Sequence, residues 1–280
     1  MDWADGTPAH REPGIRARQP AIQKRIAIRP SAPDQAVAQR ASLMQRLYIG
    51  TRTVQGAFER YAKKFNLLEV RLDLDTSLSA KTLRRWRKQV PPTFAFCVVL
   101  PNTVTALLPS KEGDRDLDQS LEIATQLESP VILIANPMSV TPTVANRKRL
   151  ETLVKRIPHD VVRLAWEPPG LWQDEDSRII AGYLGLVLVG DAARDSLAPG
   201  SVAYTRLRGL GDSRRLSAAR LDKVNERLQP FREAYVVVEV DAPVSVMNAL
   251  RASEAASGDA PVTRSRHVEF PILAEDEEQE

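Results

Sequence analysis

Residues 47–101 decide the fold and read LYIGTRTVQGAFERYAKKFNLLEVRLDLDTSLSAKTLRRWRKQVPPTFAFCVVLP. Short apolar runs with β-branched residues alternate here with longer amphipathic runs, which predicts strand, helix, strand, helix and strand. A connection long enough to contain a helix returns the next strand in the same direction, so we expect parallel strands. This stretch therefore predicts an α/β fold built on a parallel sheet.

The same alternation continues along the chain. It predicts eight strands, at residues 47–50, 67–72, 94–100, 131–135, 161–167, 186–189, 202–207 and 235–240. Helices are expected at 56–64, 80–89, 116–128, 144–156, 173–182, 217–228 and 244–255, and the connection 190–200 is expected to be short and irregular. Eight such units favour a (β/α)8 TIM-type barrel over residues 46–256. A doubly wound open sheet is the alternative, but the only glycine-rich turn after a strand is the short GLG at 209–211, a weak phosphate-binding signal.

Both ends of the chain differ from this pattern. Residues 1–45 contain five prolines and more basic than acidic side chains, without a helical or strand period, and we expect a disordered basic extension there. A short helix within 34–45 remains an alternative. Residues 257–280 are expected to form a flexible acidic tail. Its last ten residues hold five carboxylates, without which the net charge of the remaining chain rises from +3 to +8.

Composition limits the class of protein. The 280 residues are 43% hydrophobic, enough for a substantial core, and the single cysteine, Cys97, lies in the apolar run FAFCVVL. We expect Cys97 to be a small buried side chain and the protein to lack disulfides. No apolar run approaches the roughly 20 residues that span a bilayer. The chain begins without the pattern of a secretory signal, so a cytoplasmic protein with no membrane association is expected.

Fourteen residues between 50 and 96 match, in order, the conserved pattern of a known family. They are Gly50, Thr51, Tyr61, Phe65, Asn66, Glu69, Val70, Lys81, Thr82, Trp86, Pro91, Pro92, Phe94 and Phe96. The segments LAWEPPGLW, YTRLRGLG and AYVVVEVDAPVSVMNALR resemble later strands of the same family. On these residues the chain resembles the YecE-like proteins, known as domain-of-unknown-function family 72, over residues 47–250. The resemblance implies a TIM-type barrel whose activity is unsettled.

The chain departs from the family pattern at the ends of its strands. Arg52, Thr53 and Val54 replace Ser-Gly-Trp, Val99 replaces a lysine, and Ala106 replaces a histidine. The Arg-His pair after Glu167 is Pro168-Pro169, the histidine of the seventh strand is Arg208, and Phe-Asn-Asn in the last strand is Val238, Glu239 and Val240. Barrel enzymes place their chemistry at the carboxyl ends of strands. The scaffold is therefore expected to have kept only part of the site.

Strand alternation indicates which charged side chains face the barrel interior, because residues two apart share a face. We predict catalytic roles for Glu69 and Glu167, as general acid or base. The predicted ligand-binding residues are Arg71, Asp73, Trp172, Arg206, Arg208 and Glu239, and Asp241 shares the face of Glu239. The alternative is that these charges pair with one another and form a structural network in a polar interior.

The sequence gives little support for a metal site or for catalysis by a nucleophilic side chain. The three histidines, His10, His159 and His267, show no ligand spacing, and no Gly-x-Ser-x-Gly motif exists. A carboxylate-only Mg²⁺ site at Glu69, Asp73 and Glu167 is a minor alternative. We therefore expect no metal and no cofactor.

The leading hypothesis is a barrel with a reduced site that binds a small anionic molecule or a protein partner, with little or no turnover. A hydrolase or lyase acting on a phosphorylated or carboxylated small molecule is the first alternative. Nucleic-acid association through the basic residues 1–45 is the second, and it is disfavoured because solvated termini are commoner.

Overall fold

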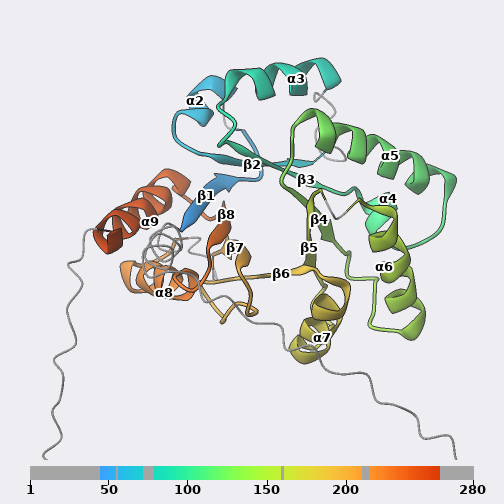
Figure 1. The fold of residues 1–280 in the computed structure, drawn as a ribbon. Coiled ribbons are helices and arrows are strands. Elements are labelled where there is room, and N and C mark those ends of the chain that lie inside the picture. The colour runs from blue at the N-terminus through green and yellow to red at the C-terminus, as the bar shows by residue number, and fades with distance from the viewer. Residues whose placement is uncertain (1–44, 55, 72–78, 159–160, 210–214, 259–280) are drawn as a thin grey trace, which may run out of the picture. The chain divides into compact units, whose positions relative to one another are not determined.

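The computed structural model of the chain describes residues 45–54, 56–71, 79–158, 161–209 and 215–258 (Figure 1). Within these ranges, eight parallel strands run in the order β1 to β8 around a closed barrel, and β8 pairs with β1 to complete it. The helices lie around the outside of the strands (Figure 1). The predicted (β/α)8 TIM-type barrel is confirmed, and the open sheet is excluded.

The strands are β1 Arg46–Thr51, β2 Leu67–Arg71, β3 Ala95–Val99, β4 Val131–Ala135, β5 Arg163–Glu167, β6 Val187–Gly190, β7 Val202–Arg208 and β8 Glu233–Glu239. The helices are α2 Phe58–Ala62, α3 Ala80–Gln89, α4 Asn102–Thr105, α5 Lys111–Gln126, α6 Val144–Arg156, α7 Asp174–Leu184, α8 Ala218–Leu228 and α9 Pro243–Gly258. As predicted, no helix separates β6 from β7.

Two helical features differ from the prediction. Helix α5 begins at Lys111 rather than Asp116, because the Ser110 hydroxyl accepts a hydrogen bond from the backbone N–H of Gly113 and caps the first turn. The single turn α4, which precedes it, was not predicted. Four-residue helices carry too little periodicity to be recognised from sequence.

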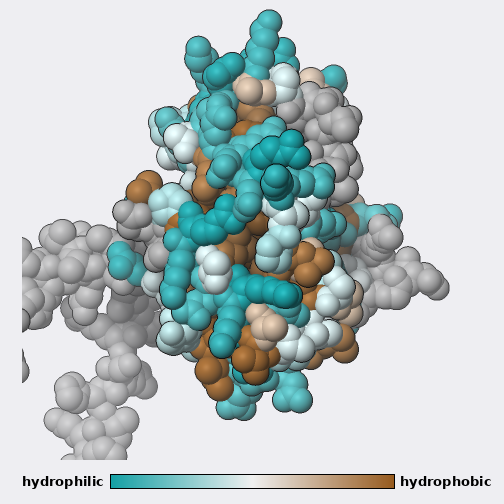
Figure 2. All heavy atoms as spheres, turned by 90° about the vertical axis from the view of Figure 1, so that its right-hand side faces the viewer, coloured by the Kyte–Doolittle hydropathy of each residue, from teal (hydrophilic) through white to brown (hydrophobic). Residues whose placement is uncertain are grey.

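The core has two layers on either side of the strands. Outward-facing side chains such as Ile49, Phe96 and Trp166 pack against the helices. Inward-facing ones, including Leu67, Cys97 and Tyr235, fill the barrel itself. Cys97 is fully buried, as predicted, and burial raises the pKa of its thiol. The face on the α5–α6 side is mostly hydrophilic, with apolar side chains in the gaps between helices (Figure 2).

The predicted terminal segments lie largely outside the described residues. At the C-terminal boundary, helix α9 continues to Gly258, two residues past the expected end of the barrel at 256. No helix in the described ranges is long and apolar enough to cross a membrane.

Candidate functional site

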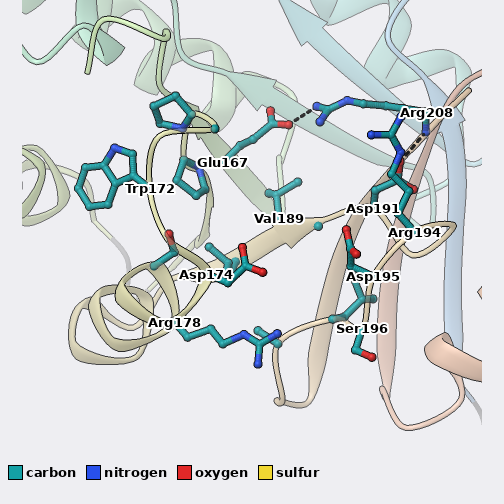
Figure 3. Close-up of a pocket in the computed structure, with 18 residues that line it drawn as sticks. Glu167, Trp172, Asp174, Arg178, Val189, Asp191, Arg194, Asp195, Ser196 and Arg208 are labelled. Carbon is teal, nitrogen blue, oxygen red and sulfur yellow. Dashed lines mark hydrogen bonds and ion pairs between the residues drawn. The ribbon is translucent and has the colours of Figure 1, made fainter. Parts of the chain in front are cut away.

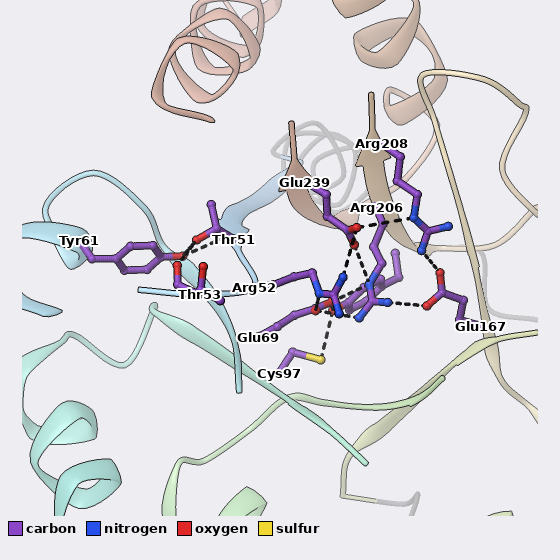
Figure 4. A network of polar contacts seen from close by, with 11 residues as sticks. Thr51, Arg52, Thr53, Tyr61, Glu69, Cys97, Glu167, Arg206, Arg208 and Glu239 are labelled. Carbon is purple, nitrogen blue, oxygen red and sulfur yellow. Dashed lines mark hydrogen bonds and ion pairs between the residues drawn. The ribbon is translucent and has the colours of Figure 1, made fainter. Parts of the chain in front are cut away.

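A network of charged side chains lies at the carboxyl ends of the strands (Figure 4). Glu69 comes from β2, Glu167 from β5, Arg206 and Arg208 from β7, and Glu239 from β8. Alternation along each strand aims these side chains into the barrel. Parallel strands end together, so residues far apart in the sequence meet at this mouth.

Glu69 and Arg206 form the buried centre of the network, with side chains exposed to 0% and 3%. The guanidinium binds the carboxylate in a bidentate manner, with Nε donating to Oε1 at 3.0 Å and Nη2 donating to Oε2 at 2.7 Å. The Tyr204 hydroxyl donates a further hydrogen bond to Oε1 at 2.6 Å. Two charges can be buried here because the geometry is that of a strong, charge-assisted pair.

The network continues outward through side chains that reach solvent. Arg206 Nη1 donates to Glu167 Oε2 at 2.5 Å, and its Nε lies 3.5 Å from Glu239 Oε1. Arg208 Nη2 donates to the other oxygen of Glu167, and its Nε lies 3.7 Å from Glu239 Oε2. Arg208 is thus both a member of the network and, at 44% side-chain exposure, a cation that solutes can reach.

Arg52, just past the end of β1, closes the network on its remaining side. Its Nη1 donates to Glu239 Oε2 at 3.4 Å, and its Nε lies 3.8 Å from Glu69 Oε2. Three arginines therefore face three glutamates, and their formal charges cancel. Each of the three carboxylates has arginine partners in this structure.

Burial and pairing shift the pKa values of Arg206, Tyr204 and Cys97. Burial lowers the pKa of Arg206, but the negative charges of Glu69 and Glu167 outweigh this effect and leave the pKa above its ordinary value. Burial raises the pKa of Tyr204 well above its ordinary value, and Cys97 and Glu69 raise it further. Near neutral pH the phenol and the Cys97 thiol therefore keep their protons and are poor nucleophiles.

A cavity of about 330 Å³ opens beside the network, next to the ends of β5, β6 and β7 (Figure 3). Glu167 and Arg208 belong to both the network and the cavity wall. Arg194, from the connection after β6, and Arg178, from α7, supply further cations. Trp172 lines the cavity from the segment before α7, where its Nε1 donates to the backbone oxygen of Val140 at 2.8 Å.

Asp191 fixes the edge of this cavity. Its Oδ1 accepts a hydrogen bond from the backbone N–H of Ala193 at 3.0 Å, and its Oδ2 accepts one from the backbone N–H of Arg208 at 3.2 Å. Arg194 Nε lies 3.4 Å from the same Oδ2. Burial raises the pKa of Asp191, although these hydrogen bonds and the arginines oppose the shift. Asp191 therefore links the β6–β7 connection to the end of β7.

A family model identifies the protein family of this barrel. The model described as "Protein of unknown function DUF72" matches residues 39–267, most of the chain. The chain belongs to the DUF72 family. The resemblance seen in the sequence to the YecE-like proteins is thereby confirmed. No curated protein matches the chain.

Solved DUF72 structures share the fold at low sequence identity. A DUF72 family protein from Thermotoga maritima is 19% identical, with a TM-score of 0.57, over 76% of this chain and 99% of that one. A DUF72 family protein from Enterococcus faecalis is 13% identical, with a TM-score of 0.59, over 75% and 98%. A xylose isomerase domain containing protein from Salmonella typhimurium is 14% identical, with a TM-score of 0.53, over 76% and 97%. At such identities these matches show the fold alone.

In this DUF72 chain the structure brings together five of the eight predicted site residues, Glu69, Glu167, Arg206, Arg208 and Glu239, in one network. Trp172 lies in the adjoining cavity wall. Arg71 is half-buried at the end of β2, and Asp73 lies outside the described residues. Asp241 is exposed beyond the end of β8. The functional roles of these residues remain predictions.

The sequence did not single out Arg52, Tyr204 and Asp191. Arg52 was noted as the loss of a family residue, yet its side chain reaches Glu239. Tyr204 had the correct strand parity, two residues before Arg206, but an uncharged residue gave no signal. Asp191 lies in an irregular connection, where no periodicity assigns a direction to its side chain.

The described residues contain no group of three or more His, Cys, Asp and Glu side chains arranged to hold a metal ion. The minor alternative of a Mg²⁺ site included Asp73, which lies outside them.

Proposed function

We propose that this DUF72 barrel binds a small polar molecule carrying a carboxylate or phosphate group, in the cavity beside the network, with little or no turnover. The observation that carries the proposal is the position of Arg208. Its guanidinium is anchored by Glu167 and Glu239, yet 44% of the side chain is exposed, and it lines the cavity. An arginine fork suits the planar carboxylate and the phosphate equally well.

The rest of the cavity fits a ligand of mixed polarity. Arg194 and Arg178 offer further positive charge, while Asp174 and Asp195 offer acceptors for hydroxyl groups. The low-turnover part of the proposal is supported by the pairing of each network carboxylate with arginine. Arginine nitrogens already occupy the carboxylate oxygens that a general base would have to present to a substrate.

A thermal-shift assay tests the proposal. The anionic probes are glucose 6-phosphate, gluconate and inorganic phosphate, and neutral glucose is the control compound. An anionic probe should raise the melting temperature of the wild-type protein, and Arg208→Gln should abolish the rise. Arg163→Gln is the matched control. Arg163 is 45% exposed and pairs with Glu233 at 2.9 Å, at the opposite end of the barrel. The proposal fails if no anion stabilises the protein, or if both variants respond alike.

The hydrolase or lyase alternative rests on Glu167. This carboxylate is 16% exposed and lines the cavity, so a ligand anion that displaced it from Arg208 would leave it beside the bound molecule. In that case wild-type protein releases a product from a phosphorylated or carboxylated probe, and Glu167→Gln keeps probe binding but loses product formation. Binding without product in the wild type supports the first proposal instead.

A further inference from the structure

Helix α3 carries an uninterrupted row of positive charge. Lys81, Arg84, Arg85 and Lys88 follow the spacing i, i+3, i+4 and i+7, which places them on one face of the helix. All four are exposed, and the ten residues of α3 contain no acidic side chain. The row extends over about 10 Å, at 1.5 Å per residue.

The fold gives no account of this row, although it does account for the fifth basic residue of α3. Arg87 turns inward, where its Nη1 donates to the backbone oxygen of Phe94 at 3.1 Å and its guanidinium lies 5.4 Å from the centre of the Phe96 ring. The other four form no ion pair with any acidic residue in the described part of the chain. Like charges three and four residues apart repel, and cations in the first turn oppose the helix dipole. The row therefore costs the helix stability and needs another explanation.

The neighbouring helix α2 and the residues just after it add further exposed cations. The two helices pack side by side (Figure 1), through stacked Phe58 and Trp86 rings 4.6 Å apart and a hydrogen bond from Gln89 to Glu59 of 2.7 Å. Around α2, Arg60, Lys63 and Lys64 are exposed. We call the seven exposed basic residues at positions 60, 63, 64, 81, 84, 85 and 88 the α2–α3 basic face. Hydrophilic side chains project at the top of Figure 2, where α3 lies.

Some other surface cations of the barrel have acidic partners in the part of the chain that the structure describes, unlike these seven. Arg147 pairs with Asp176 at 3.1 Å, and Arg156 pairs with Asp114 at 2.7 Å. Within the described residues, Glu59 is the acidic side chain on α2 and α3, and it is engaged by Gln89. The α2–α3 basic face thus combines a high density of positive charge with a lack of acidic ion-pair partners among the described residues.

We propose that the α2–α3 basic face binds the phosphate backbone of a nucleic-acid duplex without reading its sequence. A duplex presents about one negative charge per 1.7 Å of its axis, so a row of cations about 10 Å long meets several phosphates at once. Arginine and lysine are the usual phosphate partners in such contacts. This surface shares no residue with the arginine-containing cavity, and none with residues 1–45, for which the sequence suggested nucleic-acid contact.

A duplex fits this face better than the other polyanions do. Single strands are bound largely by stacking on exposed aromatic rings, and Trp86 is instead packed against Phe58. Membrane-surface helices combine basic and apolar faces. The exposed large hydrophobic side chains of the described residues are Leu108, Met138, Val144, Val161, Leu171, Ile179 and Tyr183, none of them on α2 or α3.

The test uses the full chain and fluorescence anisotropy of a labelled DNA duplex of about 20 base pairs, at several NaCl concentrations between about 50 and 200 mM. The test variant is Lys81→Gln, Arg84→Gln, Arg85→Gln and Lys88→Gln combined. The control variant removes the same charge from α5 and α6 through Lys111→Gln, Arg115→Gln, Lys148→Gln and Arg149→Gln, which are also exposed. Residues 1–45 are the same in both.

The test variant should weaken duplex binding at least about tenfold and reduce the slope of log K against log salt by about 3 to 4, since each lost phosphate contact contributes about 0.9. The control should keep the slope of the wild type. The proposal is overturned if the wild-type protein does not bind, or if both variants lose affinity equally. It is also overturned if the test variant keeps its slope, or if vesicles containing phosphatidylserine are bound more tightly than the duplex in the same buffer.

Discussion

Arg206 contacts all three glutamates of the network, so its removal tests how the buried charges are held. Arg206→Met leaves Glu69 buried without its bidentate partner, and we expect the free energy of unfolding to fall by about 3 to 5 kcal/mol. Adding Glu69→Gln should recover part of this loss, because the uncompensated charge is removed. Arg163→Met breaks a half-exposed pair and should cost under about 1 kcal/mol. Urea unfolding of the four proteins measures these differences; similar losses for Arg206→Met and Arg163→Met would contradict the buried-pair account.

Tyr204 gives the barrel a predictable loss of stability in alkali. Because burial raises the pKa of Tyr204, the folded chain keeps this proton above pH 10 while the unfolded chain releases it. The free energy of unfolding therefore falls as pH rises above about 10, by about 1.4 kcal/mol per pH unit for each such group. Tyr204→Phe should reduce the steepness of this fall by about 1.4 kcal/mol per pH unit, the contribution of one proton. Tyr183→Phe, which changes an exposed ring, should not. Equal slopes for all three proteins, from unfolding curves between pH 9 and 12, would refute the assignment.

At the scale of single residues, the sequence predicted most members of the network but not which of them contact one another. Strand parity placed Glu69, Arg206 and Glu239 on inward faces, because a period of two is a local property. It could not show that Arg206 meets Glu69, which is 137 residues away. Such pairing depends on barrel closure and on side-chain length. Strand parity did not indicate Arg52 either, because this residue lies just past the end of β1.

Among the described glycines, Gly50 in β1 leaves the least room for a side chain. Gly50 pairs with Leu67, and a Cβ on residue 50 would lie 1.8 Å from the Leu67 backbone oxygen. Gly50→Ala must push β1 and β2 apart, and we expect it to cost about 1 to 3 kcal/mol or more. Gly182, inside α7, has open space around the same position, and Gly182→Ala should stabilise by about 0.5 to 1 kcal/mol. Thermal unfolding of the two variants and the wild type measures both changes in stability. Destabilisation by both changes, or by neither, would show that local space does not govern them.

The elements themselves were predictable where they are long and regular. All eight strands fall at predicted positions, since a run of apolar, β-branched residues between polar segments has few other interpretations. Helix ends were less predictable. The start of α5 depends on the hydroxyl of Ser110 and not on the apolar period, so the prediction began the helix five residues late. Residues 190–200 were correctly expected to be irregular because they lack any period.

For the whole molecule, barrel closure is stabilised unevenly around the ring. Strands β7 and β8 pair along their full length, from Val202 with Glu233 to Arg208 with Glu239. The short strand β6 pairs with β5 only at two positions, Ala165 with Val187 and Trp166 with Leu188. Glu167 on β5 spans this weaker sector, because both of its arginine partners lie on β7. Side chains therefore reinforce the ring at β6, which pairs at only two positions with each neighbour. Strands β1 and β2 also pair at only two positions.

This arrangement predicts where the barrel loosens when the network is cut. Glu167→Gln removes the charged links across β6, and we expect faster hydrogen exchange at the amides of β6, Val187–Gly190, with little change in β1 or β8. Glu239→Gln is the matched control, since it neutralises a network carboxylate on a strand that pairs fully with β7. Its effect on β6 should be small. Hydrogen exchange read by mass spectrometry or NMR distinguishes the two. If both substitutions accelerate exchange evenly around the barrel, the network supports the fold as a whole. A local effect confined to β6 in Glu167→Gln means that a single side chain holds a briefly paired part of the ring together.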